Sequence, residues 1–272
     1  MKWLSFFLIF LFFYQINHSL SYYRYTYSLD KIFEIFKNLK ANENDLNIII
    51  DCLIKLFNQV YSYTEVAKNP PQPSFNKSYY EKIDIEKGLK NIKTKDTNMY
   101  EFYRELKLLF DRLGDAHLNI KINNFFEKVK FTSPIKLNIK EYNGKTRIFA
   151  TTKISDSDYK YFRNSDSVFN MIKKNNNIPI KAINGKDPFD YITEFGGVFL
   201  KLKSIQGTFR YKFAHLLNDL NFLAYPLSKE DLSNFKVEYD NEESFTTDFV
   251  VFSDTNITAS SFDNLNMKEN EK

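Results

Sequence analysis

Residues 98–122, NMYEFYRELKLLFDRLGDAHLNIKI, combine a helical pattern and a strand pattern with a sharp break between them. Asn98 and Glu101 have the spacing of an N-terminal capping box. Four apolar residues then recur on one helical face: Phe102, Leu106, Leu109 and Leu113. Gly114 follows where a helix ends in the left-handed conformation, and alternating apolar residues come after it: Leu118, Ile120 and Ile122. The pattern predicts a helix over 98–113 and a strand over 118–122.

The residues before this stretch have mainly helical periodicity. Apolar residues recur at helical spacing twice between 28 and 62, with Ser28 as the N-cap of the first helix. The second helix carries this set: Leu46, Ile49, Ile50, Leu53, Leu56, Phe57 and Val60. The prolines of NPPQP, 69–73, exclude a helix there, and a short helix is expected at about 84–92. The sequence therefore predicts a helical domain over residues 22–125.

Strand patterns dominate after residue 125. Asn143-Gly144 separates two alternating segments and predicts a hairpin between about 135 and 150. A strand at 178–183 leads to Asn184-Gly185, and Asp187-Pro188 then starts a short helix that runs through Phe195. A helix at about 208–220 and a last hairpin, 235–239 with 245–252, complete the pattern. We expect an α+β fold, with a strand-rich module at 126–252 and a disordered tail at 253–272.

The first residues indicate targeting to the secretory pathway. Lys2 precedes the apolar run 6–14, and Ser19 and Ser21 provide a small-residue cleavage site, which predicts a signal peptide over residues 1–21. The alternative is an uncleaved N-terminal anchor, although the run is shorter than the 20 or so residues of a transmembrane helix. We expect a secreted or endomembrane-lumen protein with no stable membrane insertion. Asn76 and Asn256 head N-x-Ser/Thr sequons and are candidate glycosylation sites.

Charge and cysteine content exclude several classes of function. The formal net charge is +4, from 38 basic and 34 acidic residues, without a long block of one sign, so we expect no nucleic-acid partner. Cys52 is the only cysteine, which excludes an internal disulfide. It lies in the apolar run 48–57, so we expect a buried, inert thiol.

Two histidines follow the signal peptide, His117 and His215, and neither has metal-ligand spacing, so no metal or other cofactor is expected. His117 lies two residues after Asp115 at a change from helix to strand, where an imidazole could act as a general base. The alternative is a turn in which Asp115 caps the backbone and His117 is half-buried. The spacing alone favours this second interpretation.

The stretch EFYRELKLLFDRLGDAHLNI, 101–120, resembles the front segment of the tail-specific protease (C-terminal processing peptidase) family. The branch that contains the chlamydial protease-like activity factor is the most similar. IPIKAINGKDPFDYITEFG, 178–196, resembles the PDZ-like module that follows in that branch, and 208–213 and 224–228 continue the likeness. The resemblance implies that His117 is the general base of a serine peptidase and that Asp115 helps to orient it.

The sequence departs from that family in one important respect. The last of its seven glycines is Gly207, and none belongs to a Gly-rich loop around a serine or to a G-x-S-x-G motif. We therefore expect the N-terminal portion of a secreted serine-type peptidase-like protein that is inactive alone. The alternatives are a non-enzymatic protein that binds a peptide or an unfolded segment through the PDZ-like module, and a secreted globular protein with an accidental likeness. The oligomeric state is left open.

Overall fold

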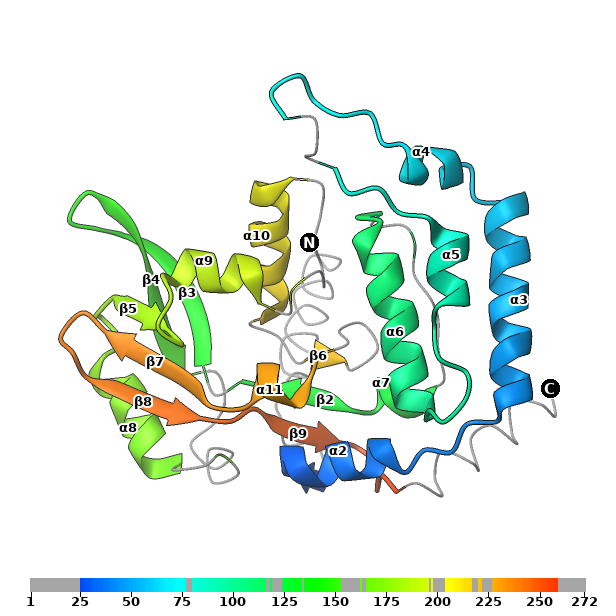
Figure 1. Cartoon of the computed structure of the whole chain (residues 1–272). Helices are drawn as coiled ribbons and strands as arrows, with labels where there is room; N and C mark the ends of the chain where they lie inside the picture. The colour runs from blue at the N-terminus through cyan, green and yellow to red at the C-terminus, as the bar shows by residue number, and fades with distance from the viewer. Residues whose placement is uncertain are drawn as a thin grey trace, which may run out of the picture.

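The computed structural model describes residues 25–76, 80–115, 118, 124–133, 135–152, 162, 165–195, 197, 204–216, 220–221 and 227–258. Helices and antiparallel strands both contribute, so the fold is of the mixed α+β type, as predicted (Figure 1). The predicted signal peptide, 1–21, lies outside the described residues. Among the described helices, none has the length and hydrophobicity needed to cross a bilayer.

The helical part begins with two capped helices. Helix α2 (Leu29–Lys37) starts at Ser28, whose hydroxyl accepts a hydrogen bond from the Lys31 amide at 3.3 Å, as predicted. Helix α3 (Glu43–Gln59) is followed by α4 (Thr64–Lys68) and α5 (Ile85–Lys90). The two predicted amphipathic helices and the short helix near 84–92 are thus confirmed.

Helix α3 differs from the prediction in how much of its apolar surface is buried. Its inner side packs against α5, but Leu56 and Val60 are 51% and 67% exposed. The prediction that Cys52 is buried is wrong, because this residue lies on the outer side of α3 and is exposed. The run 48–57 has apolar residues on both sides of one helix, and only one of these sides packs against another element among the described residues.

Helix α6 (Met99–Arg112) matches the prediction closely. The Asn98 side chain accepts a hydrogen bond from the Glu101 amide at 3.0 Å, and the four predicted apolar positions are all buried. Gly114 has φ +61°, the left-handed conformation expected at the helix end. Of the strand predicted at 118–122, only Leu118 is described, and it is not in a strand. Helix α7 (Asn124–Glu127) follows.

The two Asn-Gly turns are confirmed. Strands β3 (Ile135–Tyr142) and β4 (Lys145–Thr152) form a hairpin through Asn143 and Gly144, with φ +52° and +71° as a type I′ turn requires. Strand β5 (Ile180–Ile183) leads to the second turn, and Asp187 then caps α9 (Pro188–Glu194) by accepting from the Phe189 amide at 2.8 Å. Helix α8 (Ser165–Lys174) precedes β5, and α10 (Ile205–Leu216) follows α9.

The predicted last hairpin divides between two sheets. Strands β7 (Phe235–Tyr239) and β8 (Ser244–Thr247) pair with each other, and β5 completes their sheet. The chain then turns at Asp248, whose side chain accepts from the Asn234 amide at 2.7 Å, and continues as β9 (Val250–Ser253). The second strand predicted at 245–252 is therefore two strands.

Strand β9 joins distant parts of the chain. It pairs with β1 (Tyr25–Tyr27) on one side and β2 (Lys130–Thr132) on the other, and β6 (Leu220–Asn221) extends that sheet. Ile257 beyond it is 2% exposed, and its amide donates to the Tyr27 hydroxyl at 2.7 Å. A disordered tail was expected from residue 253, whereas these contacts hold the chain as far as Ile257.

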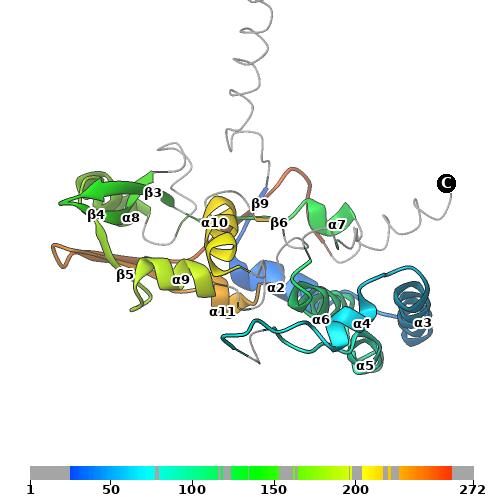
Figure 2. The ribbon, with the colours of Figure 1, turned by 90° about the horizontal axis from the view of Figure 1, so that it is seen from above.

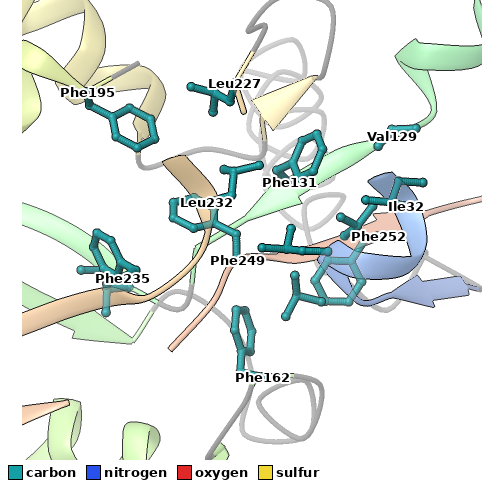
Figure 3. Packing of buried hydrophobic residues seen from close by; sticks show 14 of the residues in the cluster. Ile32, Val129, Phe131, Phe162, Phe195, Leu227, Leu232, Phe235, Phe249 and Phe252 are labelled. Carbon is teal, nitrogen blue, oxygen red and sulfur yellow. The ribbon is translucent and has the colours of Figure 1, made fainter. Parts of the chain in front are cut away.

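Two hydrophobic clusters form the core of the described residues. The smaller one lies among α3, α5 and α6, whereas the larger one runs from α2 through β2, helix α11 (Lys229–Leu232) and β9 to the β5-β7-β8 sheet. Figure 3 shows side chains of this larger core, including Ile32 of α2, Phe131 of β2 and Phe252 of β9. The core therefore extends across the domain boundary expected at residue 125.

Candidate functional site

Just beyond the end of α6 lies Asp115, the acidic residue of the segment Asp115-Ala116-His117, which is called the D-x-H motif below. Gly114 has the left-handed conformation there, and its amide donates to the Asp111 carbonyl at 3.1 Å. The amide of Leu118 in turn donates to the Asp115 carbonyl at 3.1 Å. The backbone on both sides of the motif is thus held by hydrogen bonds, while His117 itself lies outside the described residues.

Tyr61 fixes the side chain of Asp115. Its hydroxyl donates to Asp115 Oδ2 at 3.0 Å, and its ring meets the edge of Phe57 with centroids 5.2 Å apart. Burial, together with this hydrogen bond and the charge of Asp115, raises the pKa of Tyr61 to about 12, so the hydroxyl keeps its proton at neutral pH. No sequence pattern indicates this partner, because Tyr61 lies 54 residues before Asp115 and belongs to no motif.

One turn before the end of α6 lies a buried ion pair. Lys107 and Asp111 form a salt bridge four residues apart, with side chains 9% and 11% exposed. Burial raises the pKa of Asp111, against the opposing effect of the positive charges of Lys107 and Lys212. The Oδ2 atom of Asp111 is buried and has no hydrogen-bond partner within the part of the chain that the structure describes.

Lys212 links this ion pair electrostatically to the end of α9. Its side chain is 1% exposed, and Nζ donates to the carbonyls of Thr193 and Phe195 at 2.8 Å and of Gly197 at 3.0 Å. These carbonyls lie at the C-terminus of α9, where the helix dipole favours a cation. The ammonium group therefore connects α10 to α9 through hydrogen bonds, and its positive charge acts to lower the pKa of Asp111 in α6.

The other predicted site residues lie elsewhere. Asn76 and Asn256 are both exposed and lie outside helices and strands, as an accessible glycosylation site requires. The Tyr27 hydroxyl donates to Asn256 Oδ1 at 3.0 Å. His215 belongs to α10. No cluster of three or more potential metal ligands occurs among the described residues.

The arrangement supplies a carboxylate that Tyr61 holds just beyond the end of α6, two residues before a histidine. Such a carboxylate can orient an imidazole and stabilise its protonated form. No known protein family, curated protein or solved structure matches this chain.

Proposed function

We propose that this chain is the N-terminal, base-bearing part of a secreted serine-type peptidase-like protein of the tail-specific protease type. His117 would be the general base, and Asp115 would be the positioning residue that orients its imidazole. The observation that supports this role is the 3.0 Å hydrogen bond from the Tyr61 hydroxyl to Asp115 Oδ2.

A general base needs a defined orientation as well as a suitable pKa. A carboxylate accepts more than one hydrogen bond, so an Asp115 oxygen held by Tyr61 is compatible with an imidazole N–H donating to the same group. The negative charge would also favour the imidazolium form that a general base passes through. Both effects require a carboxylate that does not rotate away, and the contact with Tyr61 restricts that rotation.

Acyl transfer also requires a nucleophile and oxyanion donors, and the sequence contains neither G-x-S-x-G nor a Gly-rich serine loop. The proposal therefore concerns the part of the peptidase that carries the base. Its substrate class would be unfolded protein segments, which can enter a cleft as extended chains.

The pKa of His117 tests this proposal. In the chain without residues 1–21 the only histidines are His117 and His215, so a His215→Gln variant assigns the imidazole signals in a proton–carbon NMR titration. Replacement Asp115→Asn should lower the pKa of His117 by about 1 unit, because a nearby opposite charge is lost. Asp166→Asn, an exposed carboxylate on α8, is the matched control and should leave it unchanged. An unchanged pKa in Asp115→Asn would refute the proposed role of Asp115.

A second candidate function, peptide binding by strand addition, is supported by the geometry of β3. This strand is eight residues long and, among the described strands, pairs only with β4. Ile139 and Tyr142 on it are each 40% exposed. An edge strand of this length can pair with an extended peptide through its backbone. Addition of a reduced, alkylated unfolded protein should then slow amide hydrogen exchange in residues 135–142. The central strand β7 is the control and should not change. Unchanged exchange in β3 would exclude this function.

A further inference from the structure

The outer side of α3 carries exposed apolar residues at intervals of four, which we name the α3 stripe: Ile48, Cys52, Leu56 and Val60. Ile48, Leu56 and Val60 are 60%, 51% and 67% exposed, and Cys52 is exposed as well. Figures 1 and 2 both show α3 at the rim of the molecule, with α5 and α6 on one side of it only. A surface helix normally carries polar residues on its outer side, and a continuous exposed apolar surface indicates an interaction site.

We propose that the α3 stripe is a homodimer interface in which two α3 helices pack antiparallel about a two-fold axis next to Cys52. The central three residues of the stripe are symmetric about Cys52, since Ile48 lies four positions before it and Leu56 four positions after it, whereas Val60 would face Asn44 of the partner subunit. In an antiparallel pair centred on Cys52, Ile48 therefore faces the partner's Leu56, and Leu56 faces the partner's Ile48. A two-fold interface requires such a self-complementary surface.

The charged residues beside the stripe favour the same arrangement. Asp51 and Lys55 are exposed and lie on the same margin of the stripe. Antiparallel pairing about a two-fold axis brings this margin against the same margin of the second copy. Asp51 is then offset from the partner's Lys55 by two residues, about 3 Å along the helix axis. Two symmetric ion pairs form, and they contribute more to orientation than to affinity.

The separation of packed helices suits a contact between the two copies of Cys52. Helix axes pack about 8–10 Å apart, and the Cα atoms lie about 2.3 Å from each axis. Facing Cα atoms are therefore about 3.4–5.4 Å apart, which overlaps the range of about 4.4–6.8 Å found in disulfides. A disulfide between the two copies can thus report the proposed geometry.

The dimer should be weak and dependent on concentration. One helix face from each copy buries less than the roughly 800 Å² per partner of a standard interface. Interfaces of standard size already extend to micromolar dissociation constants. We therefore expect a monomer–dimer equilibrium with a dissociation constant of about 1 µM or more under reducing conditions.

Oxidative cross-linking together with sedimentation velocity tests the proposal on the chain without residues 1–21. Oxidised glutathione is the oxidant: two Cys52 thiols release two protons and two electrons and form one disulfide, while the glutathione disulfide is reduced to two thiols. We expect rapid formation of the covalent dimer, and a Cys52→Ser variant that still dimerises reversibly.

Leu56→Lys should reduce both dimerisation and the cross-linking rate at least about tenfold, because it places a charge against the partner's Ile48. Asn47→Lys makes the same addition of charge at an exposed position of α3 away from the stripe, and should leave both unchanged. A wild-type monomer at several hundred micromolar would overturn the proposal, as would equal cross-linking of the Leu56→Lys variant. A monomer whose Cys52 resists maleimide would also overturn it, by showing that the stripe is covered within one copy.

Discussion

Replacement of Lys212 by methionine should strongly destabilise the protein. Methionine has a similar length and fills a similar volume, but it cannot donate hydrogen bonds. The change removes three hydrogen bonds, at 2.8, 2.8 and 3.0 Å, from a side chain that is 1% exposed. The carbonyls of Thr193, Phe195 and Gly197 would then lose their shared cationic partner at the end of α9.

The size of the loss follows from two opposing effects. Each hydrogen bond to a charged group contributes about 1.5–3 kcal/mol, whereas burying the ammonium group costs several kcal/mol. We expect a net loss of about 3 kcal/mol in the free energy of unfolding, or about 6–12 °C in Tm for a chain of this size.

Urea unfolding followed by far-UV circular dichroism measures this loss. Arg210→Met is the matched control, because it removes a positive charge from an exposed position of the same helix and should change stability by less than about 0.5 kcal/mol. A Lys212→Met variant as stable as this control would refute the assigned role of the three hydrogen bonds.

Three further predictions concern the α6 end and the surface. Tyr61→Phe should cost about 1 kcal/mol in urea unfolding, because Asp115 loses a part-buried hydrogen bond; a loss no larger than about 0.2 kcal/mol would contradict the contact. Burial raises the pKa of Asp111 above 3.8, so the folded protein binds the proton of this carboxyl group more tightly than the unfolded chain does. The free energy of unfolding of the wild type, relative to that of Asp111→Asn, should therefore increase as the pH falls from 7 towards 4. Urea midpoints of both proteins at each pH test this, and a difference that stays constant or becomes smaller as the pH falls would contradict it. Secretion from a eukaryotic host should give a product that loses mass with glycosidase, and Asn76→Gln with Asn256→Gln should abolish that change; an insensitive wild-type product would contradict both sites.

Local signals in the sequence predicted much of the backbone. The Asn143-Gly144 turn has both positive φ angles, and Ser28, Asn98 and Asp187 accept the capping hydrogen bonds expected of them. These features depend on neighbouring residues only, so their chemistry can be read from short stretches of sequence.

Long-range contacts were not predictable in the same way. The pairing of β9 with β1 joins Ser253 to Tyr25, and no local pattern specifies a partner so far away in the chain. The burial of Lys212 could not be predicted from the sequence either, because a lysine in a helical pattern is normally exposed to solvent. Cys52 shows the opposite error, since its apolar neighbours indicated a core position that tertiary packing does not provide.

The candidate site was predicted in part. The sequence identified Asp115 and its place at the end of α6, but it gave no sign of Tyr61, which comes from the segment between α3 and α4. A hydrogen-bond partner supplied by tertiary structure can be recognised only when the elements are placed in space.

The tautomer of neutral His117 tests the central proposal most directly. If the Asp115 carboxylate orients the imidazole as it would for a general base, Nδ1 should carry the proton and Nε2 should be the basic nitrogen. Two-bond proton–nitrogen NMR spectra at pH 8, with His215→Gln for assignment, distinguish the two forms. We predict the Nδ1–H form in the wild type and its loss in Asp115→Asn. A wild-type His117 with its proton on Nε2, unchanged by Asp115→Asn, would contradict the proposal.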